Sequence, residues 1–222
     1  AEASFGGPAA VFDHGHTVFH AFSRDAQPEL LTAGLGETWD GITELAIKPF
    51  SCVAFLHPGV DALLDLVREE DLKADDIESL VMHFPRSGVH CIDDNPLRSH
   101  SAQYILPVAV VDREVRVGVF FEDRRETDPA LAALSRRTRV VADDGELEEA
   151  FPNFYATVIE VTTRDGRTVR RRNDIARGYP ESPLSEDDLV AKFTALVSAV
   201  APAGRVGALL ECIAGLPGAP NI

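Results

Sequence analysis

Residues 156–172 read ATVIEVTTRDGRTVRRR and carry the clearest local structural signal of the chain. Apolar and polar side chains alternate before and after Asp165-Gly166, as is typical of β-strands with one buried face. An Asp-Gly connection favours the tight turn of a β-hairpin, because glycine accepts the positive φ that such a turn requires. The stretch therefore predicts two antiparallel strands, with arginines 170–172 on a solvated edge strand.

Further strands and several helices surround this hairpin in the sequence. IESLVMHFP (77–85) and TRVVAD (138–143) are typical of strands. A helix is expected from Pro58-Gly59 onward, where apolar residues recur with helical spacing. Later helices are expected at Ser101 to Val111 with an irregularity at Pro107, at residues 128–137, at 182–200 behind a Ser/Asp-type cap, and after the break at 202–204. This mixture predicts an α+β fold: a small antiparallel sheet with packed helices.

The composition argues against several classes of protein and partner. With 222 residues, of which 45% are hydrophobic, the chain can bury a core and is not expected to be disordered. A net charge of −15 argues against nucleic acid as a partner, because phosphate binding needs a basic surface. A few cationic side chains in a cleft can still attract a small anion. The apolar runs are shorter than the ~20 residues of a membrane span, so no membrane partner is expected.

The N-terminus and the cysteines bear on localisation. No basic region followed by an apolar one marks a secretory signal, although the chain begins at Ala1 without Met, so processing can have removed targeting information. Cys52, Cys91 and Cys212 are far apart and form no CxxC pair, so neither a zinc site nor a disulfide framework is expected. A reducing cytoplasm is the predicted compartment.

No nucleotide- or metal-binding motif is found in the sequence. It contains no glycine-rich phosphate loop, no dinucleotide fingerprint and no His-Glu-x-x-His zinc motif. His14, His16 and His20 are close together, but no acidic ligand is fixed beside them. No metal site is therefore predicted.

Lys48 is the first candidate for a functional side chain, because it opens the apolar stretch KPFSCVAFLH (48–57). Burying a lysine costs free energy unless its charge meets an anion, which makes Lys48 a candidate ligand for an anionic substrate. The alternative is that its aliphatic stem lies along apolar surface while the ammonium stays in water. The residues alone leave both interpretations open.

The second candidate segment is NPLRSHSAQY (95–104), which places polar side chains at the start of a helix. Helical spacing puts His100 and Tyr104 on one face with Gln103 beside them, and Arg98 precedes them. The positive end of a helix favours carboxylates, so the segment is a candidate for binding an acidic ligand. The alternative is an ordinary polar helix cap.

Both segments resemble the MmgE/PrpD family of 2-methylcitrate dehydratases and cis-aconitate decarboxylases. NPLRSHSAQY is similar to the family's N-P-x-x-R-D-H-x-x-Q-Y stretch, shortened by one residue, and to the R-H-S-x-Q-Y stretch of the decarboxylases. Lys48-Pro-Phe followed by His57 resembles K-x-[FY]-P…H, with Ser51 in place of the family's Pro. Further similar motifs follow in the family's order: Asp128-Pro129, TTRDG (162–166), GYPESPLS (178–185) and Lys192-Phe193.

The resemblance implies an enzyme of which this chain is the C-terminal half. Family members are longer and begin with a helical domain, and their active site lies between that domain and the α+β domain. Residues 1–47 would then link to the helical domain, and residues 48–180 would form the α+β domain. The C-terminal helices of residues 181–222 would pack on the absent helical domain. The expected partner is a helical N-terminal domain or subunit, in a homo- or hetero-oligomer.

The resemblance also implies a reaction and roles for the candidate residues. Family members act without a metal or organic cofactor on di- and tricarboxylates, so the expected function is a lyase, a dehydratase or decarboxylase of an acid such as 2-methylcitrate or cis-aconitate. Lys48 and Arg98 would hold substrate carboxylates while Tyr104 donates a hydrogen bond or a proton. His100 would orient or assist in catalysis. Further substrate contacts would come from Gln103 and His57. The alternatives are an isomerase or epimerase of a related acid, and a non-catalytic subunit that binds a helical partner.

Overall fold

The computed structural model describes residues 11–12, 17–120, 122–202 and 204–218. The chain divides into two units, residues 1–43 and 44–222. Among the described residues of the first unit, Thr17 is the only buried one, and Trp39 is 63% exposed. That described part therefore holds no hydrophobic core of its own. Its elements are α1 (Val18–Phe22), η1 (Pro28–Leu31) and α2 (Asp40–Thr43).

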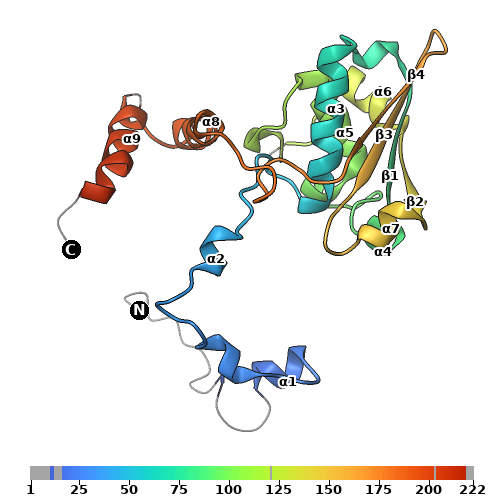
Figure 1. Ribbon diagram of the computed structural model, residues 1–222. Coiled ribbons are helices and arrows are strands. Elements are labelled where there is room, and N and C mark those ends of the chain that lie inside the picture. The colour runs from blue at the N-terminus through green and yellow to red at the C-terminus, as the bar shows by residue number, and fades with distance from the viewer. Residues whose placement is uncertain (1–10, 13–16, 121, 203, 219–222) are drawn as a thin grey trace. The chain divides into compact units, whose positions relative to one another are not determined.

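The second unit is built on a four-stranded sheet with the strand order β2-β1-β3-β4 (Figure 1). Strand β1 (Ile77–Pro85) pairs antiparallel with β3 (Thr157–Thr163), which pairs antiparallel with β4 (Thr168–Asn173). Strand β2 (Thr138–Asp143) lies on the other side of β1 and is parallel to it. The predicted α+β class is confirmed. The sheet is mixed and not wholly antiparallel, because the chain between β1 and β2 passes through helices and returns to the same end of the sheet.

The hairpin expected from the Asp165-Gly166 turn joins β3 to β4. Gly166 has a φ of +89°, in the left-handed region that the turn requires. Thr162 pairs with Thr168 across the first rung after the turn. Strand β4 lies at the edge of the sheet, as its run of arginines predicted.

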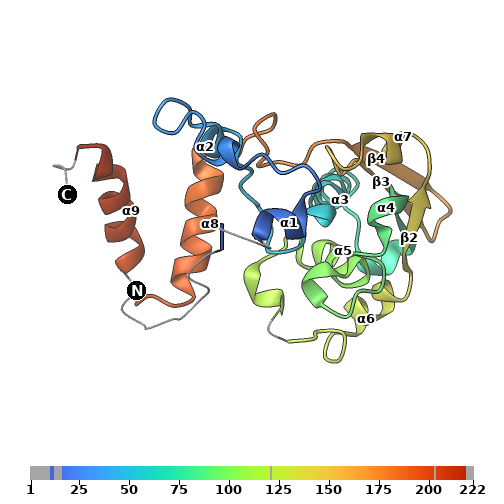
Figure 2. The same cartoon turned by 90° about the horizontal axis from the view of Figure 1, so that it is seen from below.

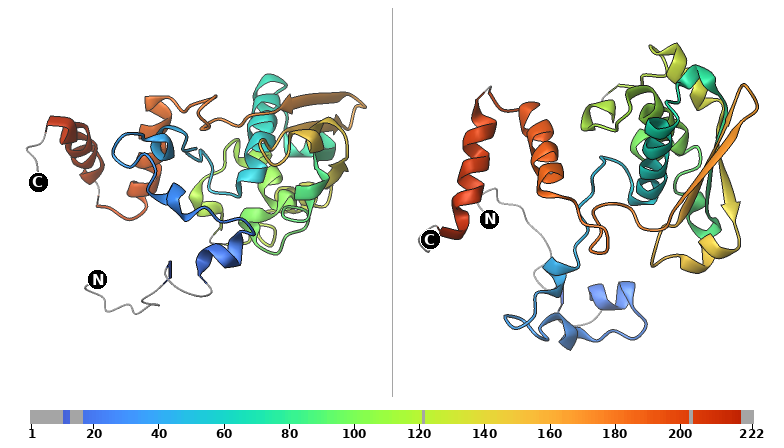
Figure 3. Two further views of the ribbon diagram at one scale, coloured as in Figure 1. Left: turned by 60° about the horizontal axis from the view of Figure 1, so that its bottom comes forward. Right: turned by 45° about the horizontal axis from the view of Figure 1, so that its top comes forward.

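One face of the sheet is covered by helices and forms the core. Leu80, Met82 and Phe84 alternate along β1 and are fully buried. Met82 contacts the start of α3 (His57–Glu69), where its side chain lies 3.1 Å from the position that a Cβ on Gly59 would occupy. Figure 3 (right) shows α3 lying along this face of the sheet.

Helix α5 (Ala102–Asp112) packs against α3 and is buried on all sides from Ala102 to Val110. The helix continues through Pro107, where an irregularity was expected. Pro107 lacks the N–H that would bond to the carbonyl of Gln103 four residues earlier. That carbonyl instead accepts a hydrogen bond of 2.6 Å from the Ser135 hydroxyl, which compensates for the missing donor.

The remaining elements of the α+β body are short. The predicted helix over 128–137 forms α6, and Asp128 caps it by accepting bonds from the backbone N–H groups of Ala130 and Leu131. The bounds of these elements are η2 (Ala54–Leu56), η3 (Ala74–Asp76), α4 (Arg86–Val89), η4 (Arg98–His100), η5 (Val117–Phe120), α6 (Pro129–Ser135) and α7 (Glu146–Ala150).

The chain ends in α8 (Glu186–Ser198), α9 (Arg205–Gly215) and η6 (Leu216–Gly218). Ser185 caps α8 in a capping box with Asp188, as the sequence predicted. The two helices lie side by side (Figure 2) but bury none of their described residues, and Ile213 is 49% exposed. No helix in the described part of the chain is long and apolar enough to cross a membrane.

Candidate functional site

Three segments that are far apart in the sequence meet near the start of α3. We call residues 44–56 the entry loop and residues 174–185 the exit loop. The backbone N–H of Ile47 donates to the carbonyl of Gly178 at 2.8 Å, which joins the two loops. The N–H of Val53 donates to the carbonyl of Ser99 at 2.9 Å, which joins the entry loop to the start of η4 and α5. Both sequence-predicted segments therefore belong to one region of the body.

The carbonyl of Cys52 in the entry loop brings two predicted site residues together. The Lys48 ammonium donates to this oxygen at 3.2 Å, and Nε2 of His57 lies 3.3 Å from it. Lys48 is exposed, so its ammonium stays accessible to solvent or to a ligand. Burial raises the pKa of the Cys52 thiol to about 12, so this thiol is not a nucleophile near neutral pH.

His57 is buried at the first position of α3 and is neutral near pH 7. The pKa of its imidazole is lowered to about 4, chiefly by burial and also by the charges of Lys48 and Lys192, while the hydrogen bond with the Cys52 carbonyl opposes the shift. Because the Cys52 carbonyl can only accept, the neutral ring carries its proton on Nε2 and leaves Nδ1 as an acceptor. The edge-on ring of Phe50, with its centroid 5.5 Å away, packs beside the imidazole.

Tyr104 is fully buried in the first turn of α5. Its hydroxyl donates to the carbonyl of Glu122 at 3.1 Å, and the guanidinium of Arg125 lies 5.4 Å from its ring centroid. Burial raises the pKa of the Tyr104 phenol, while the nearby charge of Arg98 opposes that rise. The hydroxyl is therefore protonated at neutral pH and can act as a hydrogen-bond donor.

Gln103 and His100 take part in contacts within the chain. The Gln103 oxygen accepts from the N–H of Asp94 at 2.9 Å, and its amide nitrogen donates to the carboxylate of Asp93 at 2.7 Å. These two bonds fix the loop before η4, and the buried Gln103 side chain thus has a structural role. Nδ1 of His100 lies 3.0 Å from the Ser99 hydroxyl. Substrate contact by either side chain stays a prediction.

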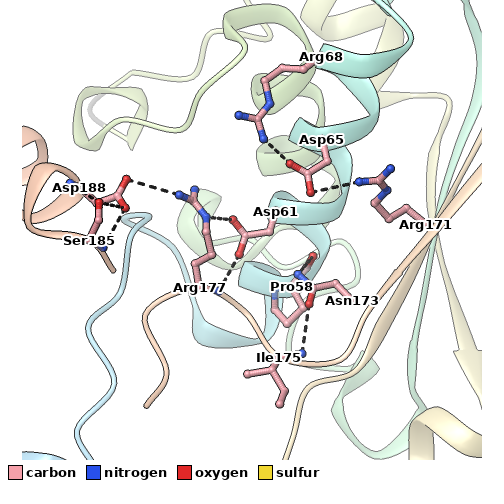
Figure 4. Close-up of polar contacts among 10 residues, drawn as sticks. All are labelled: Pro58, Asp61, Asp65, Arg68, Arg171, Asn173, Ile175, Arg177, Ser185 and Asp188. Atoms are coloured by element: carbon pink, nitrogen blue, oxygen red, sulfur yellow. Dashed lines mark hydrogen bonds and ion pairs between the residues drawn. The ribbon is translucent and has the colours of Figure 1, made fainter. Parts of the chain in front are cut away.

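A buried carboxylate links α3 to the exit loop and to α8 (Figure 4). Asp61 is 7% exposed and accepts two hydrogen bonds from Arg177, at 2.9 Å from its backbone N–H and at 3.0 Å from its Nε. The same guanidinium reaches Asp188 of the α8 capping box at 3.6 Å. Burial raises the pKa of Asp61, and its bonds with Arg177 oppose the rise. Arg177 thus joins three elements through two carboxylates.

We expect Asp61→Asn to lower the free energy of unfolding by about 2–3 kcal/mol, because its amide would present a donor to Arg177. Fully buried pairs cost more to break, but the Arg177 side chain is 47% exposed and partly screened by water. Asp65→Asn is the matched control one turn further along α3, since Asp65 is 39% exposed and should cost less than about 1 kcal/mol. Urea denaturation of both variants measures the difference, and equal losses would contradict it.

Gly178 in the exit loop occupies a position that only glycine fits. Its φ is +95°, and a Cβ there would lie 1.9 Å from the carbonyl oxygen of Ile47. Its N–H donates to the carbonyl of Ser182 at 2.7 Å, which closes the exit loop on itself. The glycine therefore permits the close approach of the entry and exit loops.

Three residues of this region escaped the sequence analysis as site residues: Asp61, Arg177 and Lys192. The Lys192 ammonium donates to the backbone carbonyl of Lys48 at 2.7 Å. Asp61 does leave a signal in the sequence, because it is an acidic residue within the apolar stretch Val60 to Leu64 of a predicted helix. The pairing of Asp61 with Arg177 spans 116 positions, and no local pattern indicates it.

The cavity with the largest open space and the described histidines were also compared with the predicted site residues. A cavity of about 220 Å³ is lined by His83, Arg170 and Arg172 among others, and none of the predicted site residues lines it. No group of three metal-ligating side chains occurs in the part of the chain that the structure describes. His14 and His16 lie outside the described residues, so the prediction made for them is not tested.

With this geometry in place, the comparison with known proteins assigns the family. Residues 50–214 match the family model of the MmgE/PrpD C-terminal domain. The chain belongs to the MmgE/PrpD family. The match begins two residues after Lys48 and covers the other site residues from His57 to Lys192, so the region around the start of α3 is part of the MmgE/PrpD domain. The resemblance noted in the sequence is confirmed.

Two relatives of this MmgE/PrpD chain are cis-aconitate decarboxylases. The protein of Mus musculus is 26% identical over 207 residues, which cover 88% of this chain and 41% of the relative. The protein of Homo sapiens is 26% identical over 210 residues, which cover 89% of this chain and 42% of the relative. The chain thus spans about two fifths of the length of these relatives.

Proposed function

We propose that this chain is the C-terminal half of a lyase that acts on a di- or tricarboxylate, by dehydration or by decarboxylation. The observation that carries the proposal is its similarity to the two cis-aconitate decarboxylases along nearly the whole of its own length. The accessible ammonium of Lys48 supports it, because a carboxylate substrate needs a cationic partner. As the family resemblance implies, the proposed reaction uses neither a metal nor an organic cofactor.

The proposed chemistry places negative charge beside a carboxylate. In a dehydration a carbon next to a carboxylate loses a proton and the neighbouring carbon loses its hydroxyl; in a decarboxylation CO₂ leaves and the carbon gains a proton. Lys48 and Arg98 would hold the carboxylates. The Tyr104 hydroxyl, whose one proton faces the Glu122 carbonyl in this structure, would turn that proton to the developing charge or supply it to the substrate. His100 would orient the donor, and His57 and Gln103 would contact the substrate.

We further propose that a helical N-terminal domain or subunit completes the active site. The relatives have more than half of their length outside the matched region. Exposed apolar side chains support a missing partner, since monomers rarely leave large apolar patches uncovered. They occur on α8 and α9 and in residues 17–47: Phe22, Leu35, Trp39, Ile42, Leu45, Leu196, Leu209 and Ile213. The three cysteines are free, which agrees with a proposed cytoplasmic location.

The experiment is to purify the chain alone and with any helical partner that accompanies it, and to assay both with 2-methylcitrate and cis-aconitate. We expect turnover by the complex and none by the chain alone. In the complex, Tyr104→Phe should lower kcat more than it raises KM, because the hydroxyl acts on the transition state. Lys48→Met should mainly raise KM, because a carboxylate loses its partner.

The other outcomes separate the alternatives. Turnover by the chain alone would contradict the need for a partner in catalysis. A monodisperse monomer at micromolar concentration would contradict the proposed assembly through the exposed apolar side chains. A complex that inverts a stereocentre of a related acid without eliminating water or CO₂ would replace the lyase by an epimerase. If Lys48→Met and Tyr104→Phe left kcat and KM of the complex unchanged, this chain would be a non-catalytic subunit that binds its helical partner.

A further inference from the structure

Two of the chain's three lysines meet at the entry loop. Lys48, Lys73 and Lys192 are the only lysines in the sequence. The Lys192 ammonium, on α8, donates to the backbone carbonyl of Lys48, while the Lys48 ammonium donates to the carbonyl of Cys52. An ammonium group has three N–H donors, so each of the two lysines keeps two donors for a further ligand.

Neither of these lysines is neutralised by a carboxylate in the described part of the chain. Arginines elsewhere show the contrast, since Arg124, Arg171 and Arg177 each contact two carboxylates. The backbone carbonyls orient the two ammonium groups but do not cancel their charges.

The natural partner of Lys192 is held elsewhere. Asp188 lies four residues earlier on α8, the spacing at which an acidic residue can pair with a lysine. One Asp188 oxygen instead accepts from the Ser185 hydroxyl at 2.6 Å and from the Ser185 N–H at 3.1 Å. The other oxygen lies 3.6 Å from Arg177. The capping box and the ion pair therefore leave the Lys192 charge without its local counter-ion.

His57 adds a third group to the same place. The Lys48 ammonium and Nε2 of His57 share the Cys52 carbonyl, and the Lys192 ammonium is bonded to the backbone of Lys48, so all three groups lie at the entry loop beside the start of α3. The imidazole stays neutral and does not compete with the lysines for an anion. Two positive charges beside a neutral ring favour an anion, such as a carboxylate, at this place.

We propose that Lys192 binds a substrate carboxylate together with Lys48, as the second cation of one anion-binding site. This assignment rests on the proposed function for the identity of the substrate, though not for the existence of the site. It gives α8 a role in recognition, because the helix supplies one of the two charges. A ligand bridging both ammonium groups would also fasten α8 to the entry loop.

The test titrates citrate, as a tricarboxylate probe, into the 222-residue chain at pH 7 and low ionic strength. NMR signals of the imidazole of His57 report binding. We expect Lys192→Met to raise the dissociation constant about tenfold, as befits the loss of one charge-assisted hydrogen bond. Lys192→Arg keeps the charge and should restore most of the affinity. Lys73→Met is the matched control, because it removes the same charge from an exposed lysine outside the site and should leave binding unchanged.

A second readout separates binding from structural support. Removing the Lys192 charge should raise the pKa of His57 in the absence of citrate, and Lys73→Met should not. Wild-type chain that does not bind citrate would overturn the proposal, as would equal affinities of Lys192→Met and wild type. The proposal would also be overturned if Lys192→Met lost both citrate affinity and free energy of unfolding and Lys192→Arg did not restore the affinity. Citrate binding that depends on Lys192, in a complex without lyase turnover, would support this site and reject the proposed reaction.

Discussion

Replacing Gly178 by alanine should lower the free energy of unfolding by about 3 kcal/mol or more, one of the largest expected effects of a single substitution in this chain. At a φ of +95° an alanine is strained, and its Cβ would lie 1.9 Å from the carbonyl oxygen of Ile47. The two residues cannot move apart without breaking the 2.8 Å hydrogen bond from Ile47 N–H to the Gly178 carbonyl. Steric strain and a lost backbone bond therefore add together.

Gly166→Ala is the matched control for this prediction. Gly166 has nearly the same φ, +89°, but no atom lies within 4 Å of the position of its Cβ. Only the conformational cost of about 1 kcal/mol should remain at this position. Urea denaturation of the two variants measures both losses. If Gly178→Ala cost no more than Gly166→Ala, the close approach of the entry and exit loops would be disproved.

Lowering the pH from 6.5 to 4 should cost the folded chain about 3 kcal/mol through His57 alone. The pKa of His57 is about 4 in the folded chain and 6.5 in a freely solvated side chain. Between these values the unfolded chain binds more protons than the folded one. The stability from the neutral, buried imidazole is therefore fully present above pH 6.5, is lost as the pH falls, and is gone below about 4.

His57→Gln isolates this contribution, because glutamine can still donate to the Cys52 carbonyl but does not titrate. As the pH falls from 6.5 to 4, the free energy of unfolding of the wild type should fall by about 3 kcal/mol more than that of His57→Gln. His83→Gln controls for the loss of a histidine, since His83 is only partly buried on β1. Guanidinium denaturation at several pH values measures both, and parallel pH profiles for wild type and His57→Gln would refute the prediction.

The helices and strands that could be predicted from the sequence are those whose pattern of apolar residues and turn residues lies within one short stretch. The alternation and the Asp-Gly turn of residues 156–172 indicated the β3–β4 hairpin, and apolar spacing indicated α3. The sequence did not predict that β2 runs parallel to β1. The pattern of its six residues indicates a strand, but it does not indicate the direction of the neighbouring strand. The helix through Pro107 depends on Ser135, a partner 32 positions from the carbonyl it satisfies.

The residues of the candidate site also fall into two groups, those that the sequence indicated and those that only the structure shows. Lys48 was noticed because a lysine in an apolar stretch is costly, and His57 through the resemblance of that stretch to the family. The structure then joined both to the Cys52 carbonyl. Arg177 and Lys192 are ordinary surface residues by type, and only the folded chain shows that they reach back to α3 and to the entry loop. Burial and pairing between distant segments, which no local window contains, give these side chains their roles.

The hydrogen bond between Ile47 and Gly178 means that the chain leaves the α+β body next to the point where it entered. A domain whose two ends are neighbours can be inserted into a host chain as one cassette, because the host needs only a small opening to receive it. The same closeness permits circular permutation, with a short linker across residues 47 and 178 and new termini opened at the exposed turn of Gly166. Helical segments on either side can then be exchanged, lengthened or encoded on another chain while the sheet keeps its strand order.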